Sequence, residues 1–104
     1  MLPEYIGARC APVFQKYNVR KAILFGSAGR GEMTAHSDID LILVMDTKKR
    51  FLDRYEGILY DLNNAIKGTC VEPLIYTAEE LDSMKERPFI SKALKEGIGL
   101  YEQK

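Results

Sequence analysis

The order of apolar and polar positions along the 104-residue chain predicts helices that alternate with strands. Residues 4–17 carry apolar side chains at helical spacing and are predicted to form an amphipathic helix, although a glycine and a proline weaken it. Short apolar runs follow at 21–25 and 38–45, and each has the length of a buried strand. The second run is apolar on both faces beyond Asp40, which is typical of a central strand.

The period of the apolar pattern changes in the second half of the chain. Between residues 48 and 67, apolar side chains recur at steps of three and four. This spacing predicts one long amphipathic helix capped by Gly68, with a stripe that packs in the core rather than stacking on bases. Residues 70–76 form a third predicted strand. Pro73 places this strand at an edge or a bulge of the sheet, because proline donates no ladder hydrogen bond.

Two further helices and a final strand are predicted towards the C-terminus. Thr77 and Glu80 have the capping-box spacing that begins one helix. Residues 88–96 form the last helix, and the tail 97–102 has the pattern of a short strand. The predicted class is therefore α/β or α+β, with one domain over residues 1–104 and a small mixed sheet of three to four strands flanked by helices.

The stretch FGSAGRGEMTAHSDIDLILV, residues 25–44, carries the candidate chemistry. Side chains alternate faces along a strand, so Asp38 and Asp40 are predicted to project from the same face, about 7 Å apart. Two like charges at this separation repel, and a divalent cation removes the conflict. Carboxylate oxygens favour Mg²⁺ or Mn²⁺. In the alternative interpretation, Asp38 is a turn residue and Asp40 a salt-bridge partner.

Glu72 is the candidate for a third carboxylate. It lies in the third predicted strand among apolar residues, where an unpaired charge is costly. We expect Glu72 to complete a site able to hold one or two metal ions. The alternative is that Glu72 is a surface residue of an edge strand.

The turn before the two acids offers a candidate phosphate site. Gly26 allows close backbone approach of a ligand, and the Ser27 hydroxyl can donate to a phosphate oxygen. Arg30 is a candidate for a bidentate phosphate contact, or for an ion pair with Glu32 or Asp38. His36 fits a solvated loop position better than a metal ligand or a base.

Composition narrows the classes of partner. Fifteen Lys and Arg balance fifteen Asp and Glu, and this zero net charge argues against strong nucleic-acid binding. The one dense basic run, 48–50, is either a solvated helix start or a contact to phosphate or to an acidic partner. Cys10 and Cys70 follow no metal-ligand spacing, so reduced thiols in the cytoplasm are expected. We identify no secretory signal and no apolar run long enough to span a bilayer.

Gly26-Ser27, ten intervening residues and Asp38-Ile39-Asp40 together resemble the nucleotidyltransferase signature of the DNA polymerase beta superfamily. The longer string resembles the minimal nucleotidyltransferase (MNT) branch, whose members have about this length. The resemblance covers most of the chain and implies a nucleotidyltransferase fold.

The resemblance also implies roles for the matching residues. Asp38 and Asp40 would bind Mg²⁺ and, through it, the triphosphate of ATP. Gly26 and Ser27 would contact the β- and γ-phosphates. Glu72 would be the third acid and the base that activates the acceptor hydroxyl. The family usually has Asp where Glu72 stands, which implies weak catalysis or loss of a second metal ion as an alternative outcome.

Members of the MNT branch are paired with a helical HEPN-type toxin encoded beside them. The resemblance therefore implies an antitoxin that transfers AMP from ATP to a tyrosine hydroxyl of this toxin. Two alternatives stay open. One is a binding module that neutralises its partner by surface burial, and the other is nucleotidyl transfer to a small molecule. A homodimer through an open sheet edge is also compatible with the sequence.

Overall fold

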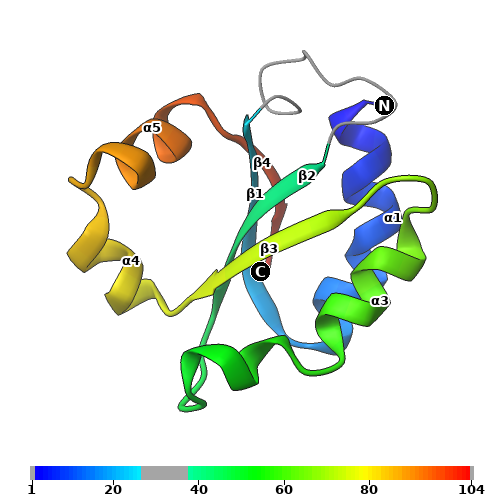
Figure 1. The fold of residues 1–104 in the computed structure, drawn as a ribbon, viewed down its shortest axis with the longest axis horizontal. Helices are drawn as coiled ribbons and strands as arrows, with labels where there is room; N and C mark the ends of the chain where they lie inside the picture. The colour runs from blue at the N-terminus through cyan, green and yellow to red at the C-terminus, as the bar shows by residue number, and fades with distance from the viewer. Residues whose placement is uncertain (1, 27–37, 104) are drawn as a thin grey trace.

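The structure is a computed structural model that describes residues 2–26 and 38–103. Its elements follow the alternation that the sequence predicts (Figure 1). In chain order they are α1 (Pro3–Lys16), β1 (Val19–Phe25), β2 (Ile39–Met45), the 3₁₀ helix η1 (Phe51–Tyr55), α3 (Ile58–Ala65), β3 (Val71–Tyr76), α4 (Ala78–Met84), α5 (Pro88–Glu96) and β4 (Ile98–Glu102).

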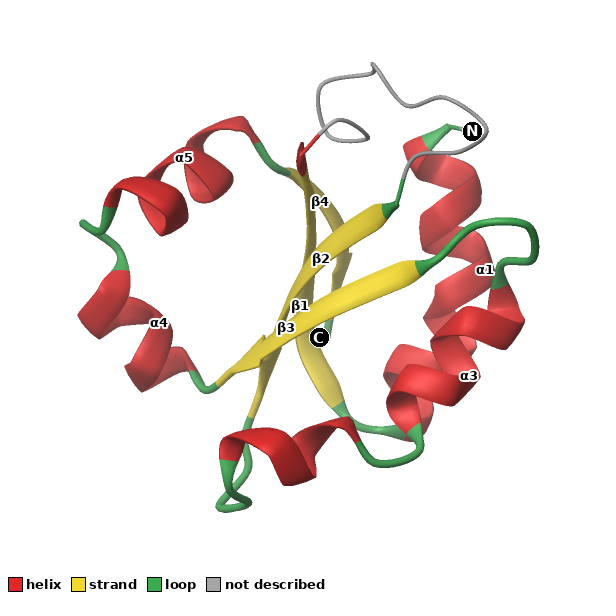
Figure 2. Cartoon of the chain, viewed as in Figure 1, coloured by secondary structure: helices red, strands yellow, loops and turns green. Residues whose placement is uncertain are grey.

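The strands form one mixed sheet in the order β3-β2-β1-β4. Strand β1 is antiparallel to both β2 and β4, and β2 is parallel to β3. Helices α1 and α3 lie on one side of the sheet, and α4 and α5 lie on the other (Figure 2). The predicted α+β class is confirmed, and so are the central place of β2 and the edge place of β3.

The two faces of the sheet pack against different helices. Alternate residues of β2, such as Leu41 and Leu43, belong to the larger core cluster together with residues of α1 and α3. Ile42 points the other way and belongs to a smaller cluster with Ile90 of α5. Full burial of each such side chain contributes about 1.5–3 kcal/mol, so both layers hold β2 in place. By the same alternation, Asp40 lies on the face that α4 and α5 cover.

The long helix predicted over residues 48–67 is wrong. The chain forms η1, turns at Gly57 and then forms α3. Gly57 has a φ of 79°, and a Cβ there would lie 2.6 Å from the Tyr17 hydroxyl, so the close approach of α1 requires a glycine. The helix ends at Ala65, so Gly68 lies in the following turn and is not its cap.

Part of the apolar stripe of the predicted helix is exposed. Ile58 and Leu62 are buried in the core as predicted, but Leu52 is 79% exposed and Tyr60 is 72% exposed. The expectation that the whole stripe is core is therefore wrong. Leu52 lies in the separate helix η1, and Tyr60 is two residues from both Ile58 and Leu62, which places it on the opposite face of α3.

The outer edge of β3 is covered by side-chain hydrogen bonds. The Asn63 amide donates to the Val71 carbonyl and accepts from the Val71 N–H, and the Ile75 N–H donates to the Tyr55 hydroxyl. Residues two apart in a strand turn their backbone groups to the same side, so Pro73 also faces outwards, where its missing N–H breaks no ladder bond.

Helix α4 is held to η1 by an ion pair that the sequence did not predict. Arg54 is 9% exposed and donates two hydrogen bonds to the Glu80 carboxylate, at 2.6 and 3.0 Å. The same Glu80 completes the predicted capping box with Thr77, which is confirmed. The last helix and the final strand also lie where the sequence predicts them. None of the helices within residues 2–26 and 38–103 is long and apolar enough to cross a membrane.

Candidate active site

The strand register brings two of the predicted acids together. Asp40 is the direct partner of Glu72 across the parallel pair β2–β3. On its other side, Asp40 is the partner of Phe25, the last residue of β1. Partners in a sheet project their side chains from the same face, so the Asp40 and Glu72 carboxylates are neighbours at the end of β1 where Gly26 follows.

Gly26 lets the Asp40 carboxylate approach the backbone. It has a φ of 74°, a conformation that L residues with a side chain rarely adopt. A Cβ at this position would lie 2.7 Å from Asp40 Oδ2, closer than atoms in van der Waals contact. The group that lies against Gly26 is therefore a carboxylate of the chain itself, and the predicted approach of a phosphate stays a prediction.

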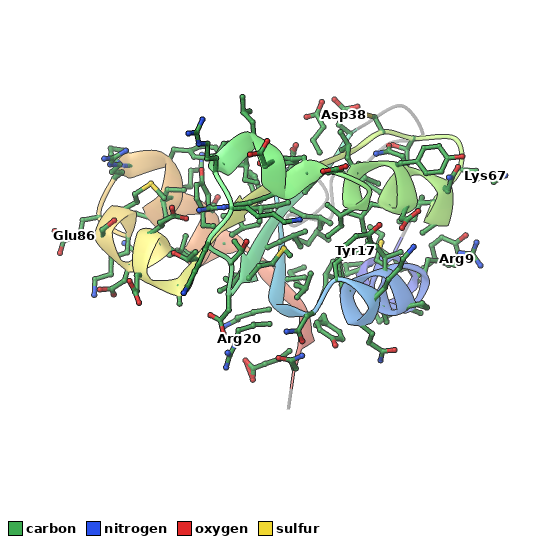
Figure 3. All side chains as sticks on the ribbon, turned by 90° about the horizontal axis from the view of Figure 1, so that it is seen from below. Arg9, Tyr17, Arg20, Asp38, Lys67 and Glu86 are labelled. Atoms are coloured by element: carbon green, nitrogen blue, oxygen red, sulfur yellow. The ribbon has the colours of Figure 1, made fainter. Side chains whose placement is uncertain are left out.

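Asp38 and Cys70 complete the cluster. Asp38 lies just before β2 at the surface of the molecule (Figure 3). One carboxylate oxygen each of Asp38 and Glu72 and the Cys70 sulfur all lie within 4.8 Å of one another. Glu72 is thus the acid that neighbours both aspartates. Both cysteines are free, and Cys70 lies beside two of the predicted acids. Spacing in the sequence does not predict this closeness, because it does not show which strand ends meet.

The electrostatics of the cluster favour a bound cation. Burial raises the pKa of Asp40 above its ordinary value, and the charges of Glu72 and Asp38 and a hydrogen bond with Glu72 raise it further. Among ion pairs between described residues, none involves these three acids. Three carboxylates that repel one another and offer oxygen donors fit a hard divalent cation such as Mg²⁺.

Three further residues considered in the sequence analysis precede Asp38 in the chain. Ser27, Arg30 and His36 lie outside the described residues, so their predicted contacts stay predictions. The basic run 48–50 is exposed and precedes η1.

The fold and the site together define a class of protein: a small α+β domain whose mixed sheet gathers three carboxylates beside a glycine turn, as metal-dependent transfer to or from phosphates requires. A comparison with protein families agrees with this class. The family model "Polymerase beta, Nucleotidyltransferase" matches residues 8–104, and the chain belongs to this family. It is a nucleotidyltransferase by family.

One named relative and one solved structure are similar to this chain. The Methanocaldococcus jannaschii protein named "Putative protein adenylyltransferase" is 33% identical, over 59% of this chain and 79% of its own length. A solved structure described as a toxin-antitoxin with AMP-PNP superposes with a TM-score of 0.67 at 16% identity, covering 94% of this chain and 74% of that chain. The second likeness shows the fold. Both are consistent with the minimal branch that the sequence resembles.

Proposed function

We propose that this chain is a Mg²⁺-dependent adenylyltransferase that transfers AMP from ATP to a tyrosine hydroxyl of a helical, HEPN-type toxin and so acts as its antitoxin. The observation that carries the proposal is the register pair of Asp40 and Glu72, with Asp38 beside Glu72 and Gly26 against Asp40. The adenylyltransferase name of one relative and the toxin-antitoxin structure with AMP-PNP support the donor and the kind of partner.

The residues of the chain supply three parts of the reaction. Asp38, Asp40 and Glu72 would hold Mg²⁺, which when bound neutralises charge that develops on the phosphates. Gly26 would contact the phosphates through its backbone, and it has no side chain that would collide with the Asp40 carboxylate. Glu72 lies at the sheet edge, is exposed, and has a carboxylate that can accept a proton from an incoming hydroxyl.

The proposed reaction forms one bond to the α-phosphorus of ATP and breaks another. The acceptor oxygen forms a bond to the α-phosphorus of ATP while its proton passes to Glu72. The bond between the α-phosphorus and the oxygen that bridges to the β-phosphate breaks, and pyrophosphate leaves with the electron pair. The products are adenylylated tyrosine and pyrophosphate.

The proposal is tested with the purified chain, ATP, Mg²⁺ and the protein encoded by the neighbouring gene. Intact mass spectrometry is expected to show one AMP added to that protein. Asp40→Asn should reduce the transfer at least about a hundredfold. Asp46→Asn is the matched control, because Asp46 follows the opposite end of β2 and pairs with Arg20.

Two other outcomes of this experiment would favour the alternative functions. A stable complex that forms without a mass change, and that survives Asp40→Asn, would contradict transfer and favour a module that acts by binding. Transfer of AMP to a small hydroxyl compound but to no protein would favour the small-molecule alternative.

A further inference from the structure

An apolar groove runs along the outer edge of β3 and reaches the candidate active site. It has a volume of about 550 Å³. Phe51, Leu52 and Leu59 line it from η1 and α3, and Pro73 and Glu72 line it from β3. We call it the β3 groove. Because Glu72 belongs both to this groove and to the acidic cluster, a side chain lying in the groove meets the carboxylates at one end.

The walls of the β3 groove present apolar surface to solvent. Phe51, Leu52 and Leu59 are 40%, 79% and 42% exposed. Contiguous exposed apolar surface on a small domain is typical of a binding site. The Phe51 ring also contacts the Tyr76 ring, with centroids 5.8 Å apart, so Phe51 lies near the far end of β3, although Tyr76 itself does not line the groove. From Glu72 to Tyr76 the strand rises about 13 Å.

The occupant of the groove does not add a strand to the sheet. Strand addition needs free N–H and C=O groups along an edge. The outward groups of Val71 are bonded to Asn63, those of Ile75 are bonded to Tyr55 and Arg54, and Pro73 has no N–H. Recognition must therefore come from side chains that enter the groove.

Charge differs between the two ends of the groove. Glu72 and its acidic neighbours lie at one end, whereas the exposed run 48–50 (Lys-Lys-Arg) directly precedes Phe51 at the other. A bound extended peptide would match these charges if one of its side chains lay at Glu72 and acidic side chains about four residues away lay at the basic run 48–50.

We propose that the β3 groove receives the acceptor tyrosine of a protein substrate, with acidic residues of the same segment directed towards residues 48–50. This inference rests on the proposed function and names where its acceptor binds. A tyrosine places an apolar ring against Leu52, Leu59 and Pro73 and a hydroxyl at the Glu72 carboxylate. A serine or threonine side chain is too short to bury comparable apolar area.

Binding is tested separately from catalysis with the peptide EEAAYAAEE, acetylated and amidated at its ends. Titrated into ¹⁵N-labelled chain, the peptide is expected to shift the amide signals of Leu52, Leu59 and Glu72. Leu52→Glu should weaken binding roughly fivefold to tenfold. Leu2→Glu is the matched control, because Leu2 is 70% exposed and lies outside the groove. The peptide with serine in place of tyrosine should bind more weakly.

Catalysis is then measured as AMP transfer to the same peptide. Leu52→Glu should raise KM roughly fivefold to tenfold and leave kcat within about twofold. If AMP is transferred but Leu52→Glu leaves KM unchanged, or if the shifted amides lie elsewhere, the groove assignment is overturned and the proposed function stands. If the peptide binds in the groove but no AMP reaches it or any protein, the proposed function is overturned and the groove stands as a peptide site. A dimer that Leu52→Glu dissociates in sedimentation assigns the groove to a second copy and overturns the proposal.

Discussion

Asp40 and Glu72 face each other across the parallel pair β2–β3, although they are far apart in the sequence. Their closeness raises the pKa of Asp40, together with burial and the charge of Asp38. Repulsion between these carboxylates destabilises the folded chain unless a cation is bound. The acidic cluster therefore lowers the stability of the metal-free chain in exchange for a site that can bind metal.

Asp40→Asn is therefore expected to stabilise the metal-free chain while it abolishes metal binding. We expect a gain of about 0.5–1 kcal/mol in the free energy of unfolding, because one of three repelling charges is removed. Urea unfolding with EDTA measures the gain, and repeating it with Mg²⁺ should stabilise the original chain but not the variant. Equal stabilisation of both by Mg²⁺ would place the ion elsewhere.

Gly26→Ala is expected to disrupt the site, since the added Cβ would collide with Asp40 Oδ2. Gly68→Ala is the matched control, because Gly68 also has a positive φ, of 91°, but a Cβ there meets nothing within 4 Å. Both variants should lose about 1–2 kcal/mol in thermal or urea unfolding. Only Gly26→Ala should weaken Mg-ATP binding in calorimetry. If Gly68→Ala lowered the affinity for Mg-ATP by the same factor, the collision with Asp40 would not explain the effect.

The two cysteines are expected to differ in their reaction with iodoacetamide. Burial raises the pKa of Cys10 to about 11, so Cys10 should react only on unfolding. Cys70 is exposed, but burial of its thiol and the charges of Asp38 and Glu72 raise its pKa. Glu72→Gln should speed alkylation of Cys70 about twofold to fivefold at pH 8, as followed by peptide mass spectrometry. An unchanged rate would mean that Glu72 does not act on the thiol.

The Arg54–Glu80 ion pair is expected to set the acid stability of the chain. Hydrogen bonds from Arg54 and, to a smaller extent, from the Thr77 backbone lower the pKa of Glu80 from 4.5 to about 2. A lowered pKa in the folded state gives stability that is present above pH 4.5 and is lost as the pH falls towards 2. Glu80→Gln should lower the free energy of unfolding by about 1–2 kcal/mol at pH 7, a modest value because the Glu80 side chain is 43% exposed to solvent. The variant should also lose less stability than the original chain as the pH falls towards 2. The exposed neighbour Glu79→Gln serves as control in the same urea series.

Asn63 is expected to protect the edge of β3. Asn63→Ala leaves the Val71 N–H without its partner and should cost about 1–3 kcal/mol in urea unfolding. It should also increase aggregation measured by light scattering, because an open edge pairs with other chains. Asn64→Ala changes the next, exposed residue of the same helix and should leave both quantities unaltered. If the two variants behaved alike, the edge would not depend on Asn63.

Most helices and strands could be predicted from the sequence, because their signals are local. The capping box of Thr77 and Glu80, the edge place of Pro73 and the paired acids Asp38 and Asp40 all depend on residues a few positions apart. Periodicity failed over residues 48–67, since it does not report a turn. Gly57 breaks that helix with a φ of 79°, and the hydroxyl of Tyr17, from another part of the chain, leaves no room for a side chain there.

The assembly of the site could not be predicted from local patterns, because it depends on which strands pair and in which register. The parallel register of β2 and β3 places Glu72 beside Asp40 and brings Cys70 to Asp38, and no spacing within the sequence encodes that register. The β3 groove likewise depends on the angle between η1 and α3. Local patterns fix which residues form strands and helices, whereas distances between carboxylates and the shape of a groove follow from packing across the whole core.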